Sequence, residues 1–292
     1  MNINMDTIIL GLIGNPLGHS LSPLMHNMTL DKLGVNGIYV PFEVSPGKLE
    51  GAIAAIRSLD IRGVNVTIPF KEEVIKYLDD LSEEAAACGA VNVISNVAGR
   101  LVGYNTDGKG FVAALQEEQI DVKGRAVFIG AGGAARSVAY ELARAGISRL
   151  DFLDLSIARA EGLANFITKS TSCCSSAQIM NENEYYILSE KADIIINCSP
   201  VGMYPNCEQS PVAEFKQIPA RAVLCDLIYN PWQTKFLRLG QEHGLKTIGG
   251  CSMFVHQGAQ TLEILMGLKP PLSFMKEVVR DQLEKRAGAN PD

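Results

Sequence analysis

Short apolar runs alternate with segments of helical periodicity along most of the chain, most clearly in its first third. This alternation is typical of an α/β layer with a parallel sheet. The apolar runs predict strands at 7–14, 37–44 and 63–68, and the periodic segments predict helices at 22–33, 46–58 and 71–78. The runs VNVISN and RLVGYN then flank Val97-Ala98-Gly99, a pattern that predicts a hairpin.

A second α/β unit begins after a polar helix that follows Asp107. Its pattern predicts helices at 133–145 and 157–169 and strands at 126–130, 150–155, 192–198, 222–228 and 246–248. The stretch from Ser170 to Asn183 is polar without a clear period, so we expect a surface excursion there. Two final helices, at 253–266 and 273–286, are expected after Gly249-Gly250.

Composition narrows the class of protein. With 292 residues, 47% hydrophobic and 20% charged, two domains are expected. The net charge of -6 and the lack of a Lys/Arg-rich run argue against nucleic acid. The sequence shows neither an apolar segment long enough to span a membrane nor a basic leader typical of a signal peptide, so we expect neither feature. Seven cysteines without a C-x-x-C pair suggest reduced thiols in a cytoplasmic protein without a metal site.

A glycine-rich run lies between a predicted strand and a predicted helix of the second unit. Residues Gly130 to Ala135 fit G-x-G-x-x-A, the fingerprint of dinucleotide binding in this context. Gly130 permits the tight turn, Gly132 lets the backbone approach the pyrophosphate, and small Ala135 lets helix and strand pack closely. The helix N-terminus offers N–H groups to phosphate. A tight turn without a ligand is the alternative interpretation.

Polar side chains also follow several strands of the first unit. Ser20 and Ser22 lie in GNPLGHSLSPLMHN directly after the first strand, where they either hold an anion or cap a helix. Lys71 comes just after Pro69 in GVNVTIPFKEEV, and Asn92 comes from GAVNVI. Side chains at the ends of separate strands converge on one edge of the sheet, where open α/β sheets place ligands. For Lys71, a solvated surface charge is the alternative.

These runs, together with GYNTDGKGF, CSPVGM, DLIYNP and GGCSMFVHQGAQ, resemble the shikimate dehydrogenase family over almost the whole chain. The resemblance implies that Lys71 and Asp107 are catalytic, and that the substrate contacts Ser20, Ser22, Thr67, Asn92, Asp107, Tyr229 and Gln257. It also implies cofactor contacts at Gly130, Ala131, Gly132, Gly133, Ala134, Asp154, Leu155, Arg159, Ser199, Val201, Leu227, Gly250 and Met253.

The same resemblance implies the domain organisation. A substrate-binding and catalytic α/β domain is expected from 1–107 plus 253–292, because the last helices return to it. A Rossmann-type, doubly wound dinucleotide-binding domain is expected from 108–252. The sequence leaves the oligomeric state open, a homodimer included.

The chain departs from the family's common pattern after the second strand of the dinucleotide domain. Asp154, Leu155 and Ser156 stand where an Asn-Arg-Thr run commonly holds the phosphate of NADP, and Arg159 is the only nearby cation. An acidic residue at this place hydrogen-bonds the ribose hydroxyls and repels a 2′-phosphate. We therefore expect NAD to be preferred over NADP. A solvated Asp154 capping the next helix is compatible with that role.

The expected function is hydride transfer between NAD and the C3 hydroxyl or ketone of shikimate or quinate, or of their 3-dehydro forms. Lys71 would act as general acid and base, Asp107 would orient it, and Ser20 and Ser22 would hold the carboxylate. One alternative is an NADP-linked shikimate dehydrogenase of aromatic amino acid biosynthesis, with Arg159 and Ser156 holding the phosphate. Another is a ligand-sensing module of the same fold without turnover.

Overall fold

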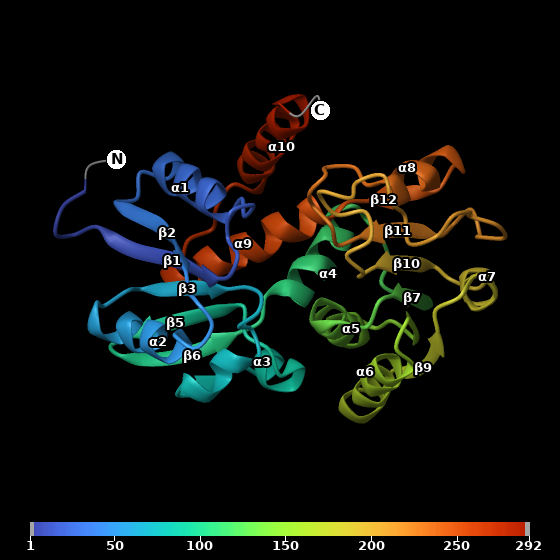
Figure 1. Cartoon of the computed structure of the whole chain (residues 1–292), viewed down its shortest axis with the longest axis horizontal. Coiled ribbons are helices and arrows are strands. Elements are labelled where there is room, and N and C mark those ends of the chain that lie inside the picture. The colour runs from blue at the N-terminus through green and yellow to red at the C-terminus, as the bar shows by residue number, and fades with distance from the viewer. Residues whose placement is uncertain (1–2, 290–292) are drawn as a thin grey trace. The chain divides into compact units, whose positions relative to one another are not determined.

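The computed structural model describes residues 3–289, and the chain divides into two compact units (Figure 1). Unit 1 contains the chain up to Thr106 together with Val255–Asp281, and unit 2 contains Asp107–Phe254 together with the chain from Gln282 on. The expected fold class, two α/β units with a Rossmann-type second unit, is confirmed. The C-terminal segment from Gln282 groups with unit 2, whereas the sequence analysis assigned the whole of 253–292 to the first domain.

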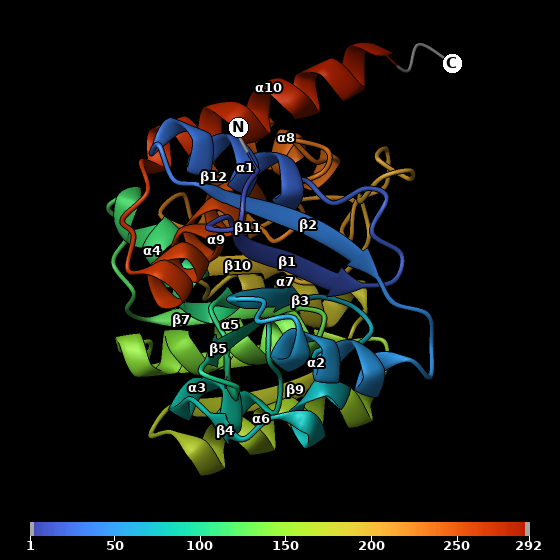
Figure 2. The ribbon, with the colours of Figure 1, turned by 90° about the vertical axis from the view of Figure 1, so that its left-hand side faces the viewer.

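The sheet of unit 1 is mixed rather than parallel. Its order is β2 (Gly37–Glu43), β1 (Ile8–Gly14), β3 (Gly63–Val66), β5 (Val93–Val97), β6 (Arg100–Tyr104) and β4 (Asp80–Leu81). Figure 2 shows β1 between β2 and β3, and it runs parallel to both. The expected parallel pairing is confirmed for β1, β2 and β3, but β5 runs antiparallel to both β3 and β6.

The predicted hairpin accounts for the antiparallel pair of β5 with β6. Val97 pairs with Arg100, so Ala98 and Gly99 form a two-residue turn. Both have positive φ, 51° and 85°, as a type I′ turn requires.

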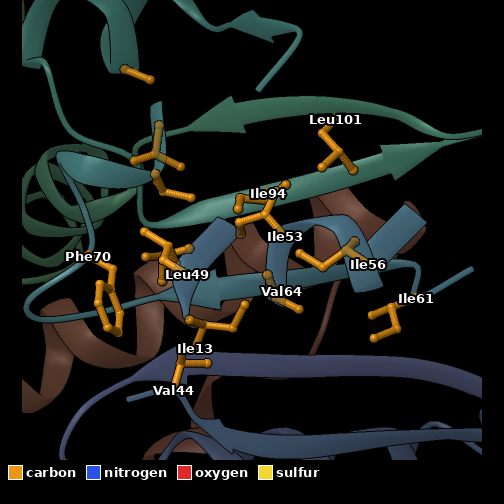
Figure 3. Close-up of a cluster of buried hydrophobic side chains, with 14 residues drawn as sticks. Ile13, Val44, Leu49, Ile53, Ile56, Ile61, Val64, Phe70, Ile94 and Leu101 are labelled. Atoms are coloured by element: carbon orange, nitrogen blue, oxygen red, sulfur yellow. The ribbon is translucent and has the colours of Figure 1, made fainter. Parts of the chain in front are cut away.

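Helices cover both faces of this sheet. Leu10 and Leu12 of β1 pack with α1 (Ser22–Lys32) and α9 (Gly250–Met266). Ile13, next along β1, joins the opposite core with α2 (Leu49–Ser58), the 3-10 helix η1 (Glu73–Tyr77) and α3 (Glu83–Cys88). Figure 3 shows Leu49, Ile53 and Ile56 of α2 lying over Val64 and Ile94 of the strands. Alternate residues of a strand face opposite layers, so unit 1 is a three-layer sandwich.

Unit 2 has six parallel strands in the order that defines a doubly wound sheet. The order is β12 (Lys246–Ile248), β11 (Val223–Asp226), β10 (Ile194–Asn197), β7 (Arg125–Ile129), β8 (Arg149–Asp154) and β9 (Cys174–Ile179). Chain order reverses between β7 and β10, and ligands of such sheets bind at that switch point, beyond the carboxyl ends of the strands.

The helices of unit 2 are α4 (Asp107–Glu117), α5 (Gly133–Ala145), α6 (Ile157–Ser170), α7 (Glu182–Ser189), α8 (Lys235–Glu242) and the end of α10 (Leu272–Ala289). The core beneath α7 and α8 includes Tyr185, Leu188, Phe236 and Leu237. Neither α7 nor α8 was predicted. Each has only eight residues, too few for a clear helical period.

One sequence expectation is wrong in unit 2. The stretch from Ser170 to Asn183 contains β9, which pairs with β8 from Cys174 to Ile179. Its sequence CSSAQI is polar because β9 is an edge strand, half-buried or exposed along its length. In unit 1, the helix expected at 71–78 is instead the shorter 3-10 helix η1.

Candidate active site

The segment after β1 brings the two predicted anion-binding serines to the start of α1. Leu21, not a serine, is the residue before the helix, and no side chain caps it. The Ser20 hydroxyl accepts a bond from the Ser22 N–H at 3.3 Å, and Ser22 is buried as the first helical residue. The cap interpretation of the serines is therefore not realised in the structure.

Thr67 lies beside the start of this segment. A Cβ added to Gly14 would come within 2.4 Å of Thr67 Cγ2, and the Thr67 N–H donates to the Ile13 carbonyl at 2.9 Å. The next bond along, from the Asn15 N–H to the Ile68 carbonyl, measures 3.0 Å. Glycine at 14 thus allows the serine segment and the Thr67 segment to run in contact.

Lys71 and Asn92 are held on adjoining backbone. The Val91 N–H donates to the Lys71 carbonyl at 2.8 Å, and the Val66 N–H donates to the Asn92 carbonyl at 2.9 Å. The Asn92 side chain is buried and forms a two-way pair with Thr106: its Nδ2 donates to Thr106 Oγ1 at 2.9 Å, and the Thr106 N–H donates to its Oδ1 at 2.8 Å. This pair fixes the Asn92 amide.

Gln257 comes to the same part of unit 1 from α9. Thr106 Oγ1 lies 3.3 Å from the Gln257 carbonyl and donates to it. Unit 1 therefore gathers Thr67, Lys71, Asn92 and Gln257 through contacts between neighbouring backbone segments. Asp107, the first residue of α4, and Tyr229 belong to unit 2; the Tyr229 ring stacks on Phe254 with centroids 4.5 Å apart.

The glycine-rich turn of unit 2 has the geometry that its fingerprint predicts. Gly130 has φ +101°, and a Cβ there would lie 3.0 Å from the Ser199 nitrogen. Gly132, Gly133 and Ala134 are exposed at the start of α5, where no side chain caps the helix. A Cβ at Gly132 or Gly133 would meet nothing within 4 Å. Open space before uncapped helical N–H groups suits a phosphate.

Asp154 differs from its expected role. Its side chain is 8% exposed. Oδ2 accepts from the Ala131 N–H at 2.8 Å, while Oδ1 accepts from the Ser156 N–H at 2.8 Å and lies 3.0 Å from Arg159 Nη2. Both oxygens of the carboxylate thus bond to the backbone of the turn, and one of them also pairs with Arg159. The N–H of Ala131 donates to Asp154. Leu155 and Arg159 are exposed to solvent.

The loop after β10 is held by a buried polar cluster. Asn197 Oδ1 accepts from the Ser199 hydroxyl at 2.7 Å and from the Ser199 N–H at 3.0 Å, and its Nδ2 donates to Asp226 Oδ1 at 3.1 Å. Asp226 Oδ2 accepts from the Thr234 hydroxyl at 2.7 Å. Burial raises the pKa of Asp226 to about 6 because the charged form is poorly solvated there.

The remaining predicted cofactor residues surround this cluster. Ser199 Oγ accepts from the Val201 N–H at 3.3 Å, and the Leu227 N–H donates to the Asn197 carbonyl at 3.0 Å. A Cβ at Gly250 would come within 2.3 Å of the Leu227 carbonyl oxygen, so only glycine fits there. Met253 is buried one turn further along α9.

Sequence reasoning missed Thr106, Asn197 and Asp226 as parts of the site. Thr106 lies next to Asp107 in the run GYNTDGKGF, and Asp226 begins the run DLIYNP, which contains Tyr229. Their polar character at a strand end was the available signal.

No group of three or more His, Cys, Asp or Glu side chains in the described part of the chain could hold a metal ion. Within residues 3–289, every helix is also too short or too polar to cross a bilayer.

Unit 1 is a mixed α/β unit in which segments that carry hydroxyl, amide and lysine side chains adjoin, and unit 2 is a Rossmann unit with an open glycine-rich turn. This combination is typical of two-domain, dinucleotide-dependent enzymes. The family model described as shikimate dehydrogenase substrate binding domain matches residues 12–94. A shikimate dehydrogenase (NADP(+)) of Syntrophomonas wolfei is 61% identical over 292 residues, which is 100% of each chain. The chain belongs to the shikimate dehydrogenase family.

Solved structures agree with this assignment. A shikimate dehydrogenase crystallised with NADP⁺ is 38% identical, with a TM-score of 0.89 over 97% of this chain and 98% of that one. The shikimate 5-dehydrogenase of Listeria monocytogenes, in complex with shikimate and NAD, is 32% identical, with a TM-score of 0.91 over 96% and 98%.

The expected preference for NAD is wrong. Four curated relatives that are 40% to 61% identical to this chain are all named shikimate dehydrogenase (NADP(+)). The physical reason lies in the side chain on which the preference was based. The inward-facing carboxylate of Asp154, paired with Arg159, does not present an isolated negative charge at the strand end.

Proposed function

We propose that this chain is an NADP-linked shikimate dehydrogenase, which interconverts shikimate and 3-dehydroshikimate by hydride and proton transfer at C3. The observation that carries the proposal is the gathering of Thr67, Lys71, Asn92 and Gln257 in unit 1, in a chain 61% identical from end to end to an enzyme of that name. NADP⁺ supplies the hydride acceptor.

The proton is the part of the reaction that the chain itself must handle. Lys71 Nζ takes the C3 hydroxyl proton as the hydride leaves and returns it in the reverse direction, which is general acid–base catalysis. Asp107 orients Lys71 and binds a ring hydroxyl. Ser20 and Ser22 hold the carboxylate, since their hydroxyls at the start of α1 are donors suited to an anion. Thr67, Asn92, Tyr229 and Gln257 bind the remaining hydroxyls.

The cofactor contacts follow from the turn of unit 2. The N–H groups at Gly132, Gly133 and Ala134 bind the pyrophosphate, supported by the uncapped start of α5 and by the helix dipole. Arg159, whose side chain is 62% exposed, binds the 2′-phosphate with help from the Ser156 hydroxyl. Leu155 packs on the adenine side. Ser199, Val201, Leu227, Gly250 and Met253 line the nicotinamide side.

A paired assay tests this function. Purified protein is mixed with shikimate and either NADP⁺ or NAD⁺, and the absorbance of the reduced nicotinamide is followed; quinate replaces shikimate in a parallel series. We expect turnover with shikimate and NADP⁺, with a higher kcat/KM than for NAD⁺. Turnover of quinate above shikimate, or equal use of the two cofactors, would contradict the proposal.

A further inference from the structure

A chain of buried polar side chains crosses the interior of unit 1 behind the proposed substrate residues. The Tyr39 hydroxyl donates to Asn65 Oδ1 at 2.7 Å. Asn65 Nδ2 in turn donates to the Asn92 carbonyl at 3.1 Å and to Thr261 Oγ1 at 3.0 Å. Tyr39, Asn65 and Thr261 are 1%, 6% and 0% exposed. Asn65 is the branch point, because it bonds to three different segments: β2, the residue before β5, and α9.

The two hydrogen bonds that Asn65 Nδ2 donates lead to segments that carry proposed substrate contacts. One reaches the Asn92 carbonyl directly. The other passes through Thr261, whose hydroxyl donates to the Gln257 carbonyl at 3.1 Å, one turn back along α9. Thr106, which pairs with the Asn92 amide, reaches that same carbonyl from the other side. Asn65 thus ties the backbones of Asn92 and Gln257 together without belonging to either segment.

The opposite end of the chain is closed by packing. The His26 ring stacks on Tyr39 with centroids 4.4 Å apart, and neither of its nitrogens has a hydrogen-bond partner among the described residues. Burial lowers the pKa of His26 to about 3, so the ring is neutral where it packs on Tyr39. Tyr39, which bonds to Asn65, is thus packed between His26 and the core of unit 1.

Stability alone does not require these groups. Replacing both partners of a buried hydrogen bond by apolar groups of similar shape is often nearly neutral, whereas a satisfied polar network fixes one arrangement of its members. After such a replacement the Asn92 carbonyl would keep its bond from the Val66 N–H. What an apolar core would lose is the fixed orientation of two segments.

We propose that Asn65 is a positioning residue for substrate binding, holding Asn92 and Gln257 at the separation and orientation that the ring hydroxyls of the substrate require. This inference rests on the proposed function, since it concerns the same substrate. Asn65 itself does not touch the substrate; it acts through the Asn92 carbonyl and through Thr261.

Two variants test the positioning role. The first replaces the network by apolar residues of similar size, with Tyr39→Phe, Asn65→Leu and Thr261→Val combined. The second is the single change Thr261→Val, which breaks the branch to Gln257 and disturbs packing little. We expect both to raise the KM and the Kd for shikimate, about tenfold for the triple variant. Their KM for NADP⁺ should stay within about twofold, because the cofactor residues belong to unit 2. Thr261→Ser should restore tight binding.

Asn96 provides a matched control within unit 1. It is also a buried asparagine on a strand, with Nδ2 donating to the Ile56 carbonyl at 3.1 Å and to the Ile61 carbonyl at 3.0 Å. Its Oδ1 accepts from the Gly99 N–H at 2.9 Å, so it secures the hairpin rather than the substrate segments. Asn96→Leu should lower the thermal midpoint of unfolding and leave the Kd for shikimate unchanged.

The measurements are steady-state kinetics, thermal unfolding and calorimetric titration of shikimate. Wild-type affinity in both network variants would overturn the positioning role alone. An equal loss of affinity in Asn96→Leu would overturn it too, since general softening of unit 1 would then be the cause. A parent protein that neither binds nor oxidises shikimate would instead overturn the proposed function, and the positioning role with it.

Discussion

The polar residues at the strand ends of the two sheets are used in opposite ways. In unit 1 they carry amides and hydroxyls that bond to one another, as Asn92 does with Thr106, and that link the segments of the proposed substrate site. In unit 2, β8 and β11 end on the carboxylates Asp154 and Asp226, which bond inward to the turns of their own unit. The amide of Asn197, the last residue of β10, likewise bonds inward, to Asp226 and Ser199.

The same sequence signal, a polar residue at a strand end, therefore has two possible structural roles. A carboxylate can recognise a ligand only if its oxygens are available to it. Both oxygens of Asp154 instead accept backbone N–H bonds, so the residue orders the glycine-rich turn. The prediction of NAD assumed an outward-facing carboxylate, and the burial of the side chain is what the sequence did not reveal.

The largest expected effect concerns Lys71, the proposed general acid and base in unit 1. Lys71→Ala should lower kcat by roughly 10² to 10⁴ while the Kd for shikimate changes little, because acid–base help acts mainly in the transition state. Lys76→Ala is the matched control: Lys76 follows five residues later in η1, and its side chain is 60% exposed. Near-normal turnover in Lys71→Ala would remove this lysine from the mechanism.

The inward-facing carboxylate of Asp226 predicts a pH dependence of stability. Its pKa is raised from 3.8 to about 6 in the folded protein, so between about pH 4 and pH 6 the native state keeps a proton that the unfolded chain releases. Stability from this group is therefore present at low pH and lost as the pH rises through 6, by up to about 3 kcal/mol.

Asp226→Asn isolates that contribution, because an amide does not titrate. Its oxygen can still accept from Asn197 and from the Ile228 N–H, while its NH2 group donates to the Thr234 hydroxyl instead of accepting from it. Urea unfolding of both proteins from pH 4.5 to pH 8 should show the free energy of unfolding of the parent falling relative to that of the variant, and the difference levelling off above pH 7. Parallel curves over this range would show that Asp226 ionises as an ordinary aspartate.

The turn itself can be tested with two glycines that differ in their surroundings. Gly130→Ala should destabilise the protein by about 1–3 kcal/mol, because φ is +101° and the new Cβ would crowd the Ser199 nitrogen. Gly133→Ala should leave the unfolding midpoint unchanged, since a Cβ there meets nothing, but its methyl group would enter the space proposed for pyrophosphate and raise the KM for NADP⁺. Equal midpoints for both variants would contradict this account of the turn.

How far the sequence could be interpreted also differs between the units. The doubly wound sheet and the glycine-rich turn were predictable because strong local rules govern them: buried parallel strands are continuously apolar, and the turn needs glycine at Gly130. The antiparallel pairing of β5 with β3 in unit 1 and the polar edge strand β9 were not. Strand direction depends on pairing between distant segments, and an edge strand exposed on its open side lacks an apolar pattern.

The smallest expected effect concerns Arg159, which pairs with Asp154 at the end of β8. Arg159→Ala should raise the KM for NADP⁺ about tenfold, because a charged hydrogen bond to phosphate typically contributes about 1.5–3 kcal/mol, and solvent screens an exposed arginine toward the lower end of that range. The KM for NAD⁺, which lacks the phosphate, should not change. Arg221→Ala is the control: this arginine is 63% exposed and pairs with Asp193 as Arg159 pairs with Asp154, but it lies on the loop before β11. If Arg159→Ala weakened both cofactors equally, Arg159 would act by holding Asp154 and the turn in place, and the phosphate would be bound elsewhere in unit 2.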